Sequence, residues 1–416
     1  MTREGAPKAL GHLRICDFTG QLAGAGATRF LAAFGAQVIR IEDPTNRGRW
    51  DILRGAPPFP DKRRGNELGS AFNNHNVEKL GITLNVKHER GRELLRELVK
   101  VSDVVSENFA AGVMNRLGFG YDTLKELKPD IIYVSNCGFG GTGPYWRYKS
   151  WGPIAQAMSG LTLHSGLPDM PPAGWGYSYM DHTGGYYMAI GILAALLHRS
   201  RTGEGQWVDM SCTEAGAALN GPALLDYTVN GRGVRRPGSP DTNRSQWAPH
   251  APHGIYPARG DDEWIALACR SDDEWRILAS EIGEPWAGEP RWADYAGRAG
   301  AQDELDKLIG AWTAHHDRWQ LAGRLRHAGI PAAAVSRPDE RIDDDANTAA
   351  WPLWPTVEHR EIGQIRVDGM PVHLSETDWT IERGAPCLGE HNDMVYSEVL
   401  GLSAAEIDQL REEGVI

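Results

Sequence analysis

The chain of 416 residues is predicted to be an α/β protein with a parallel sheet of Rossmann type. Short apolar strands alternate with helices through its first half, which is typical of a doubly wound sheet. The first three elements, at 13–17, 25–34 and 37–42, form a strand–helix–strand unit, and such units place their strands in parallel. After about Leu225 a long loop and a series of helices follow, which indicates a second, smaller domain.

The remaining elements continue this alternation. A polar loop after 37–42 is either a solvated surface loop or a clamp for phosphate groups, and its cations are Arg47, Arg49, Arg54, Lys62, Arg63 and Arg64. Further strands are predicted at 80–86, 103–107, 130–136 and 206–211, with helices at 89–101, 111–117 and 151–160. Later elements are a loop at 231–254, a strand at 264–269, helices at 272–283, 303–316, 318–328 and 404–413, and a hairpin at 356–367.

The stretch at 175–214 organises the chain. Its residues 188–197 carry no charge and predict a buried helix of about twelve to eighteen residues, too short to span a membrane. Asp181 lies just before this helix or in its first turn, where it is either an N-cap or a nucleophile that the helix N-terminus keeps ionised. Gly184 and Gly185 would let another group approach closely, and they or residues 138–143 could donate backbone N–H groups to an oxyanion.

The composition excludes several classes of function. A formal net charge of −12 disfavours non-specific nucleic-acid binding, although a local basic pocket could hold a small anion. The five cysteines are scattered and form no CxxC pair, so we expect neither a zinc site nor a disulfide framework, as in a reducing cytosol. The N-terminal residues lack the apolar core of a signal peptide. We therefore expect a cytoplasmic protein without a membrane span.

A dinucleotide-dependent oxidoreductase is one alternative. Gly24 and Gly26 match part of the GxGxxG fingerprint, and Glu42 ends the second strand, where an acid would bind a ribose. Arg29 occupies the place of the third glycine, so the fingerprint is incomplete.

Four longer segments occur in order along the chain: GAQVIRIEDP, DVVSENFAAGVMNRLGFGY, DHTGGYYMAIGILAALLHRSRTGEGQWVDMSCTEA and APCLGEHNDMVYSEVLGLSAAEIDQL. They resemble the family III CoA-transferases, which include formyl-CoA:oxalate, carnitine and bile-acid CoA-transferases. The resemblance runs from Leu13 to the C-terminus and weakens at 231–254. It implies that CoA moves from an acyl-CoA donor to a carboxylic acid through an aspartyl intermediate. Coenzyme A and acyl-CoA are then substrates, and no cofactor is bound permanently.

The resemblance also implies roles for particular residues. Asp181 falls on the family's covalent nucleophile. The family holds CoA at a strand end that corresponds to Asn108 and Phe109, and by an arginine in the following helix, here Arg116. Further CoA contacts are implied at Gln21, Leu22, Ala23, Arg40, Leu84 and Lys87.

The family's fold implies a Rossmann-like large domain built from both chain ends, a small α/β domain between them, and two chains interlocked as a homodimer. On this sequence the large domain would comprise residues 1–225 and 336–416, and the small domain residues 226–335. The expected partners are an acyl-CoA and a carboxylic acid, with no nucleic acid and no membrane.

The nearest alternative enzyme is an α-methylacyl-CoA racemase, which shares the fold and has an aspartate at the same place. A racemase needs a second base, a histidine in the preceding helix, whereas Trp151 stands there and His164 and His182 are the nearest histidines. The acid itself stays open. A bulky, aromatic or cationic acid would suit the aromatic side chains near Asp181, which are Trp151, Trp175, Tyr177, Tyr179, Tyr186 and Tyr187.

Overall fold

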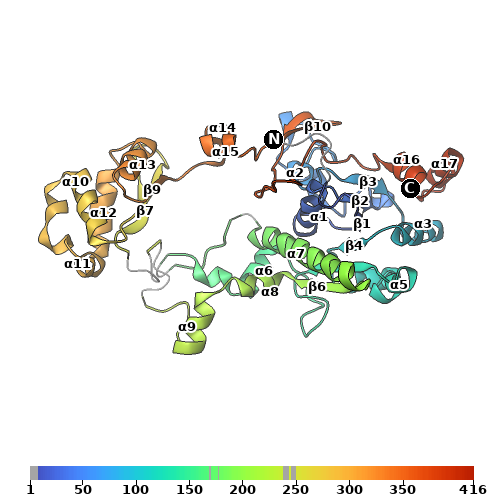
Figure 1. Ribbon diagram of the computed structural model, residues 1–416, viewed down its shortest axis with the longest axis horizontal. Helices are drawn as coiled ribbons and strands as arrows, with labels where there is room; N and C mark the ends of the chain where they lie inside the picture. The colour runs from blue at the N-terminus through green and yellow to red at the C-terminus, as the bar shows by residue number, and fades with distance from the viewer. Residues whose placement is uncertain (1–7, 168–169, 177, 238–242, 245–249) are drawn as a thin grey trace. The chain divides into compact units, whose positions relative to one another are not determined.

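The computed structural model describes residues 8–167, 170–176, 178–237, 243–244 and 250–416. The chain divides into two compact units. Unit 1 comprises Met1–Leu163, Ala173–Arg232 and Trp351–Ile416, and unit 2 comprises His164–Pro172 and Gly233–Ala350. Unit 1 therefore contains both ends of the chain (Figure 1).

A parallel six-stranded sheet forms the centre of unit 1. Its strands are β1 (Arg14–Asp17), β2 (Gln37–Glu42), β3 (Leu80–Thr83), β4 (Val104–Glu107), β5 (Ile132–Cys137) and β6 (Trp207–Ser211). They lie in the order β3-β2-β1-β4-β5-β6, and every neighbouring pair is parallel, which confirms the predicted fold class. The order reverses between β1 and β4, and parallel α/β sheets bind ligands in the crevice outside such strand ends.

Helices cover both faces of this sheet, because alternate side chains of each strand are buried on opposite faces. The helices on one face are α1 (Ala23–Ala33) and α7 (Tyr179–Thr202), and they pack on Ile15, Val38, Val104 and Ile132. The helices on the other face are α3 (Glu89–Lys100), α5 (Tyr121–Leu127) and α17 (Ala404–Glu412), and they pack on Cys16, Ile39, Val105 and Tyr133. The C-terminal helix therefore completes a layer begun by the first half of the chain (Figure 1).

Unit 1 also contains several shorter elements. The helices are α2 (Ser70–His75), α4 (Val113–Leu117), α6 (Gly152–Met158), α8 (Cys212–Ala218), α9 (Pro222–Asn230) and α16 (Asn392–Met394). The loop after β2 contains the short turns η1 (Pro44–Asn46), η2 (Ile52–Gly55) and η3 (Pro60–Lys62). The predicted hairpin is confirmed as β10 (Thr356–His359) paired with β11 (Gly363–Arg366).

Unit 2 has its own core of helices on a three-stranded sheet. The strands are β7 (His253–Pro257), β8 (Trp264–Ala268) and β9 (Ala332–Ala334), and both pairs are antiparallel. The helices are α10 (Asp272–Ile282), α11 (Tyr295–Gly300), α12 (Gln302–Thr313), α13 (Arg318–His327), α14 (Pro338–Asp343) and α15 (Ala346–Ala350). In the loop predicted at 231–254, residues 238–242 and 245–249 lie outside the described residues, and the last two residues of that range belong to β7.

Two predicted elements differ in length. Helix α7 has 24 residues, more than predicted. Gly184 and Gly185 do not interrupt it but lie inside it, where they allow close packing. A Cβ added to Gly184 would lie 2.7 Å from Cys212 Sγ, and one added to Gly185 would lie 2.7 Å from Ala23 O. Strand β3 ends earlier than predicted, since the backbone N–H of Asn85 turns away to donate to Val415 O.

Candidate active site

The loops after β1 and β4 lie where the strand order reverses, and this place is called the crevice below. A buried network supports it around Asp17, the last residue of β1. The Asp17 carboxylate accepts hydrogen bonds from Thr19 N–H (3.0 Å), the Thr28 hydroxyl (2.9 Å) and the Ser106 hydroxyl (2.8 Å). Lys79 Nζ lies 3.5 Å from the same carboxylate, and burial lowers the pKa of Lys79 to about 8. This network fixes the loop after β1 against β4 and α1.

Asn108 joins the two loops that border the crevice. The N–H of Gly20 donates to Asn108 Oδ1 (2.9 Å), and Asn108 Nδ2 donates to Gly20 O (3.0 Å). The Trp50 ring lies against Gly20, and its centroid is 4.7 Å from that of Phe109. Gln21 follows Gly20 directly, so three residues implied at the CoA site, Gln21, Asn108 and Phe109, meet at this crevice.

The Glu107 carboxylate binds the backbone of Phe109 by a hydrogen bond. It accepts from the Phe109 N–H (2.6 Å) and from the Tyr133 hydroxyl (2.8 Å). Burial raises the pKa of Glu107 to about 7, and the nearby charge of Asp209 adds to this rise. The two hydrogen bonds lower the pKa but do not offset the effect of burial. These hydrogen bonds tie the backbone of Phe109 to the end of β4 and to β5.

The other residues implied at the CoA site divide by exposure. Arg116 and Lys87 are exposed; Lys87 Nζ lies 3.8 Å from Asp43, and Arg116 forms no ion pair with any described residue. The remaining four are buried, and they are Leu22, Ala23, Arg40 and Leu84.

Arg40 lies beneath the crevice and is only 1% exposed. Its guanidinium donates to Thr19 O (2.6 Å), Asn76 Oδ1 (3.0 Å) and Asp51 Oδ2 (2.8 Å). With these partners Arg40 holds the loops of the crevice together from within the protein.

Asp181 lies in the first turn of α7. The N-cap of this helix is Ser178, whose side chain makes no capping hydrogen bond, so the interpretation of Asp181 as the N-cap is wrong. We expected the helix N-terminus to favour the ionised carboxylate, but burial acts in the opposite direction. It raises the pKa of Asp181, against a hydrogen bond from Ser178 that lowers it.

Two further elements bear on the Asp181 carboxylate, one by packing and one through its charge. At the start of α6, Gly152 approaches so closely that an added Cβ would lie 2.7 Å from Asp181 Oδ2. In α8, burial and the charge of Asp181 raise the pKa of the Cys212 thiol to about 12. This thiol is therefore protonated at neutral pH and does not compete as a nucleophile. Its Sγ lies 3.2 Å from Asn136 Oδ1.

Helix α7 also connects Asp181 to the crevice. One turn beyond Asp181, Gly185 packs on the carbonyl of Ala23, where α1 begins. Gln21 and Leu22 directly precede that residue. The carboxylate and the crevice therefore lie along the same edge of unit 1.

The predicted oxyanion donors are wrong where the structure tests them. Gly184 and Gly185 lie inside α7, where backbone N–H groups bond within the helix. The N–H of Gly141 donates to Asp209 Oδ1 at 2.7 Å.

The dinucleotide alternative finds no support in the geometry. Glu42 accepts from Arg54 at 3.0 and 2.6 Å and is only 6% exposed, so it is not available to a ribose. Arg29, in place of the third glycine, is buried and donates to Asp368 O and Gly369 O.

The residues that bear on a second base lie as follows. Trp151 is the exposed N-cap of α6, and the His182 ring lies 5.4 Å from that of His75. Tyr177 lies outside the described residues.

Within the described ranges, no group of three His, Cys, Asp or Glu side chains could hold a metal ion. No helix in these ranges has the length and apolar character to cross a membrane.

No sequence feature predicts the close approach of Gly152 to Asp181. A glycine followed by a proline is common at the start of a helix and indicates no particular contact. If Asp181 is the nucleophile that the family resemblance implies, Gly152→Ala should lower kcat on the order of 10–100-fold, because the new methyl group would displace the Asp181 carboxylate. A matched control is Gly323→Ala, whose Cβ would meet nothing within 4 Å. The Gly152→Ala change should also lower the melting temperature in the wild type but not in an Asp181→Ala background; equal losses in both would contradict the contact.

Comparison with known proteins gives a consistent result. The family model for CoA-transferase family III matches residues 10–392. The formyl-CoA:oxalate CoA-transferase of Streptomyces coelicolor is 34% identical over 98% of this chain and 99% of its own length. The succinyl-CoA–D-citramalate CoA-transferase of Chloroflexus aurantiacus is 32% identical over the whole of both chains. A crystal structure of a CAIB/BAIF family protein from Brucella suis superposes with a TM-score of 0.84 and 28% identity, covering 94% of this chain and 99% of that one.

Proposed function

Since the chain belongs to CoA-transferase family III and is a CoA-transferase, we propose that it transfers CoA between two carboxylic acids through a covalent intermediate on Asp181. One observation carries this proposal. Asp181 is a partly buried carboxylate at the start of α7, Gly152 packs close to it, and its charge helps to keep the Cys212 thiol protonated.

The chemistry needs only this carboxylate and the two substrates. Asp181 attacks the thioester carbonyl of the acyl-CoA, which gives a mixed anhydride and releases the CoA thiolate. The thiolate attacks the aspartyl carbonyl, so the first acid leaves and CoA is held as an aspartyl thioester. The carboxylate of the second acid then attacks that thioester, giving a second mixed anhydride and free thiolate. Attack of the thiolate on the acyl carbonyl of the second acid releases the new acyl-CoA and restores Asp181.

The surroundings of Asp181 suit these steps. A partly desolvated carboxylate is a better nucleophile than a hydrated one, and an anhydride must be kept from water. Asp181 is partly buried, and Gly152 packs close to one of its carboxylate oxygens.

The crevice beside Gln21, Asn108 and Phe109 is the proposed place of the CoA chain, with the exposed Arg116 and Lys87 for its phosphates. Arg116→Ala should raise the KM for acyl-CoA about 10-fold while the KM for the acid stays unchanged, since a guanidinium binds phosphate by charge-assisted hydrogen bonds. A matched control is Arg90→Ala, because Arg90 is exposed and already pairs with Glu93. An unaltered KM for acyl-CoA would remove Arg116 from the site.

A panel of acyl-CoA donors and acid acceptors tests the proposed function. Oxalate and D-citramalate are the first acids to try, since relatives are named for them. Aromatic and cationic acids follow, because Trp175 and Tyr179 pack together before Asp181 with ring centroids 5.3 Å apart. Exchange of CoA with none of the acids would count against the proposal.

A second assay separates transfer from racemisation. A 2-methylacyl-CoA incubated in deuterated water, without an acid acceptor, should keep its α-proton, because Trp151 cannot act as the second base. Rapid exchange of that proton would instead favour a racemase.

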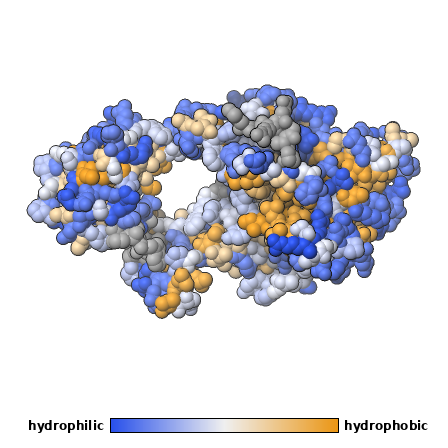
Figure 2. Space-filling model, in the orientation of Figure 1, coloured by the Kyte–Doolittle hydropathy of each residue, from blue (hydrophilic) through white to orange (hydrophobic). Residues whose placement is uncertain are grey.

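We further propose that the protein works as a homodimer in the cytoplasm. Helix α9 exposes Leu224, Leu225, Tyr227 and Val229 by 58–76%, and Figure 2 shows hydrophobic surface along this helix and part of α7. Exposed apolar surface of this kind is typical of an interface with another chain. The five cysteines are all free thiols, which suits a reducing compartment.

A further inference from the structure

Gln21, at the crevice, has an unusual backbone conformation. Its φ of 55° lies in the left-handed region, which residues other than glycine rarely adopt because Cβ crowds the backbone there. The residue forms the corner between the loop after β1 and helix α1, which begins at Ala23. Strained residues of this kind persist only where neighbouring groups hold them, and they gather at functional sites. We therefore looked for the group that holds Gln21.

Asp51 supplies that group from the loop after β2. Its Oδ2 accepts from the N–H of Gln21 at 2.9 Å and from the guanidinium of Arg40 at 2.8 Å. Its Oδ1 accepts from the N–H of Leu53 at 3.1 Å. Asp51 is only 1% exposed, and both of its oxygens bond to protein donors. It is therefore placed to hold the corner at Gln21 and not to contact a substrate itself.

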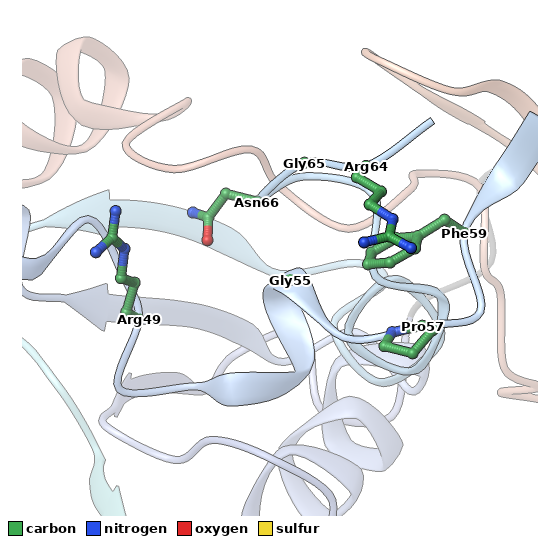
Figure 3. A pocket seen from close by; sticks show the side chains of 7 residues that line it. All are labelled: Arg49, Gly55, Pro57, Phe59, Arg64, Gly65 and Asn66. Carbon is green, nitrogen blue, oxygen red and sulfur yellow. The ribbon is translucent and has the colours of Figure 1, made fainter. Parts of the chain in front are cut away.

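The loop that carries Asp51 borders two regions. A pocket of about 550 Å³ is lined by residues that include Arg49 and Gly55, on either side of Asp51 in the sequence (Figure 3). Asp51 and its neighbour Trp50 instead contact the loop after β1, where Trp50 lies against Gly20. Two consecutive side chains of one loop thus support two consecutive residues of the crevice.

The corner at Gln21 also bears on the helix of the proposed nucleophile. At the start of α1, the carbonyl oxygen of Ala23 would lie 2.7 Å from a Cβ added to Gly185 of α7. Gly185 follows Asp181 by about one helical turn. A shift of the corner would therefore move the start of α1 against the helix that carries Asp181. Support of Gln21 affects both the crevice and this helix.

We propose that Asp51 is a positioning residue for CoA transfer: its carboxylate keeps Gln21 in the left-handed conformation in which the loop after β1 receives the acyl-CoA. This inference rests on the proposed function and extends it to a buried residue whose oxygens are already bonded within the protein. The alternative is a purely structural role, in which Asp51 only balances the charge of Arg40. The two roles differ in the effect of a glycine at position 21, because glycine adopts a positive φ without a steric penalty.

The test is a double-mutant cycle. Asp51→Asn should raise the KM for acyl-CoA about 10-fold and leave the KM for the acid unchanged. In a Gln21→Gly background the same change should raise the KM less than about 2-fold, since the conformation no longer needs to be held. In a Gln21→Ala background it should again raise the KM about 10-fold, because alanine lacks the glutamine side chain but keeps the Cβ. Asp61→Asn is the matched control, since this exposed acid of the same loop lies 3.9 Å from Arg63.

An equal rise in all three backgrounds, or no rise in any, would overturn the proposal, and the equal rise would favour a counter-ion for Arg40. Asp51→Glu is a second variant that keeps the charge beside Arg40, so the chain should fold even where Asp51→Asn does not. Its longer side chain displaces the acceptor from Gln21, and the same dependence on background is expected. Calorimetry with CoA measures the cycle without turnover. A cycle that holds in binding while no acid receives CoA would count against the proposed catalysis and not against Asp51.

Discussion

Asp181→Ala is expected to abolish CoA transfer, with a loss of about 10⁴-fold or more in kcat. The reason is that the carboxylate supplies both the nucleophile and the carbonyl that carries CoA in the intermediate. The neighbouring thiol of Cys212 cannot replace it, because its pKa is raised to about 12 and it stays protonated. Asp181→Asn should be nearly as inactive, since an amide is a poor nucleophile at neutral pH.

Three measurements check this result. Both variants should still bind CoA, because the phosphates are held by other residues. Hydroxylamine added during turnover should convert the wild-type intermediate to a hydroxamate at Asp181, which peptide mass spectrometry detects. Glu214→Gln is the control, since this exposed acid also lies near Cys212 and should be dispensable. Substantial activity in Asp181→Ala, or a hydroxamate on another residue, would refute the mechanism.

The raised pKa of Asp181 also predicts a pH dependence. Attack needs the ionised carboxylate, so the rate should fall as the pH drops through a pKa above the ordinary value of 3.8. A raised folded-state pKa means that burial favours the protonated form. The contribution of this group to stability is then present below its unfolded pKa and is lost as the pH rises through the folded pKa. Asp181→Asn should therefore unfold at a higher temperature than the wild type at neutral pH.

Asp17→Ala is expected to lower the free energy of unfolding by about 3–5 kcal/mol, because it leaves a buried cation without its partner. Lys79 is fully buried and lies 3.5 Å from Asp17 Oδ2. The same carboxylate accepts from Thr19, Thr28 and Ser106, whose donors would also be left unsatisfied. CoA binding should weaken as well, since this network fixes the loop that carries Gln21.

Urea unfolding followed by circular dichroism measures the effect of Asp17→Ala. The double variant Asp17→Ala/Lys79→Met should recover part of the lost stability, because it removes the unpaired charge along with its partner. Glu89→Ala provides a comparison: its carboxylate is largely exposed, lies 3.8 Å from Arg96, and should cost less than about 1 kcal/mol. A loss for Asp17→Ala no larger than that of Glu89→Ala would show that the network does not stabilise the fold.

Much of this protein follows from periodicity in the sequence. The alternation of apolar strands and helices predicted the parallel sheet, because strands buried on both faces read as short apolar runs. Asn108, Phe109 and Asp181 could be placed at element ends for the same reason, since a strand end and a helix start are visible as changes in pattern. Membership in CoA-transferase family III, inferred from four segments, is confirmed. The domain boundaries and the roles of the site residues stay predictions.

The partners of individual side chains were decided only by the tertiary structure. Arg40 and Arg49 look alike in the sequence, yet Arg40 is buried against Asp51 while Arg49 faces a pocket. Gly152 meets Asp181 through a contact between α6 and α7 that no local pattern encodes. Burial and ion pairing depend on which residues the fold brings together from distant parts of the chain. Local periodicity therefore identified the elements, whereas the desolvation of Asp181 and the availability of each arginine depend on packing between them.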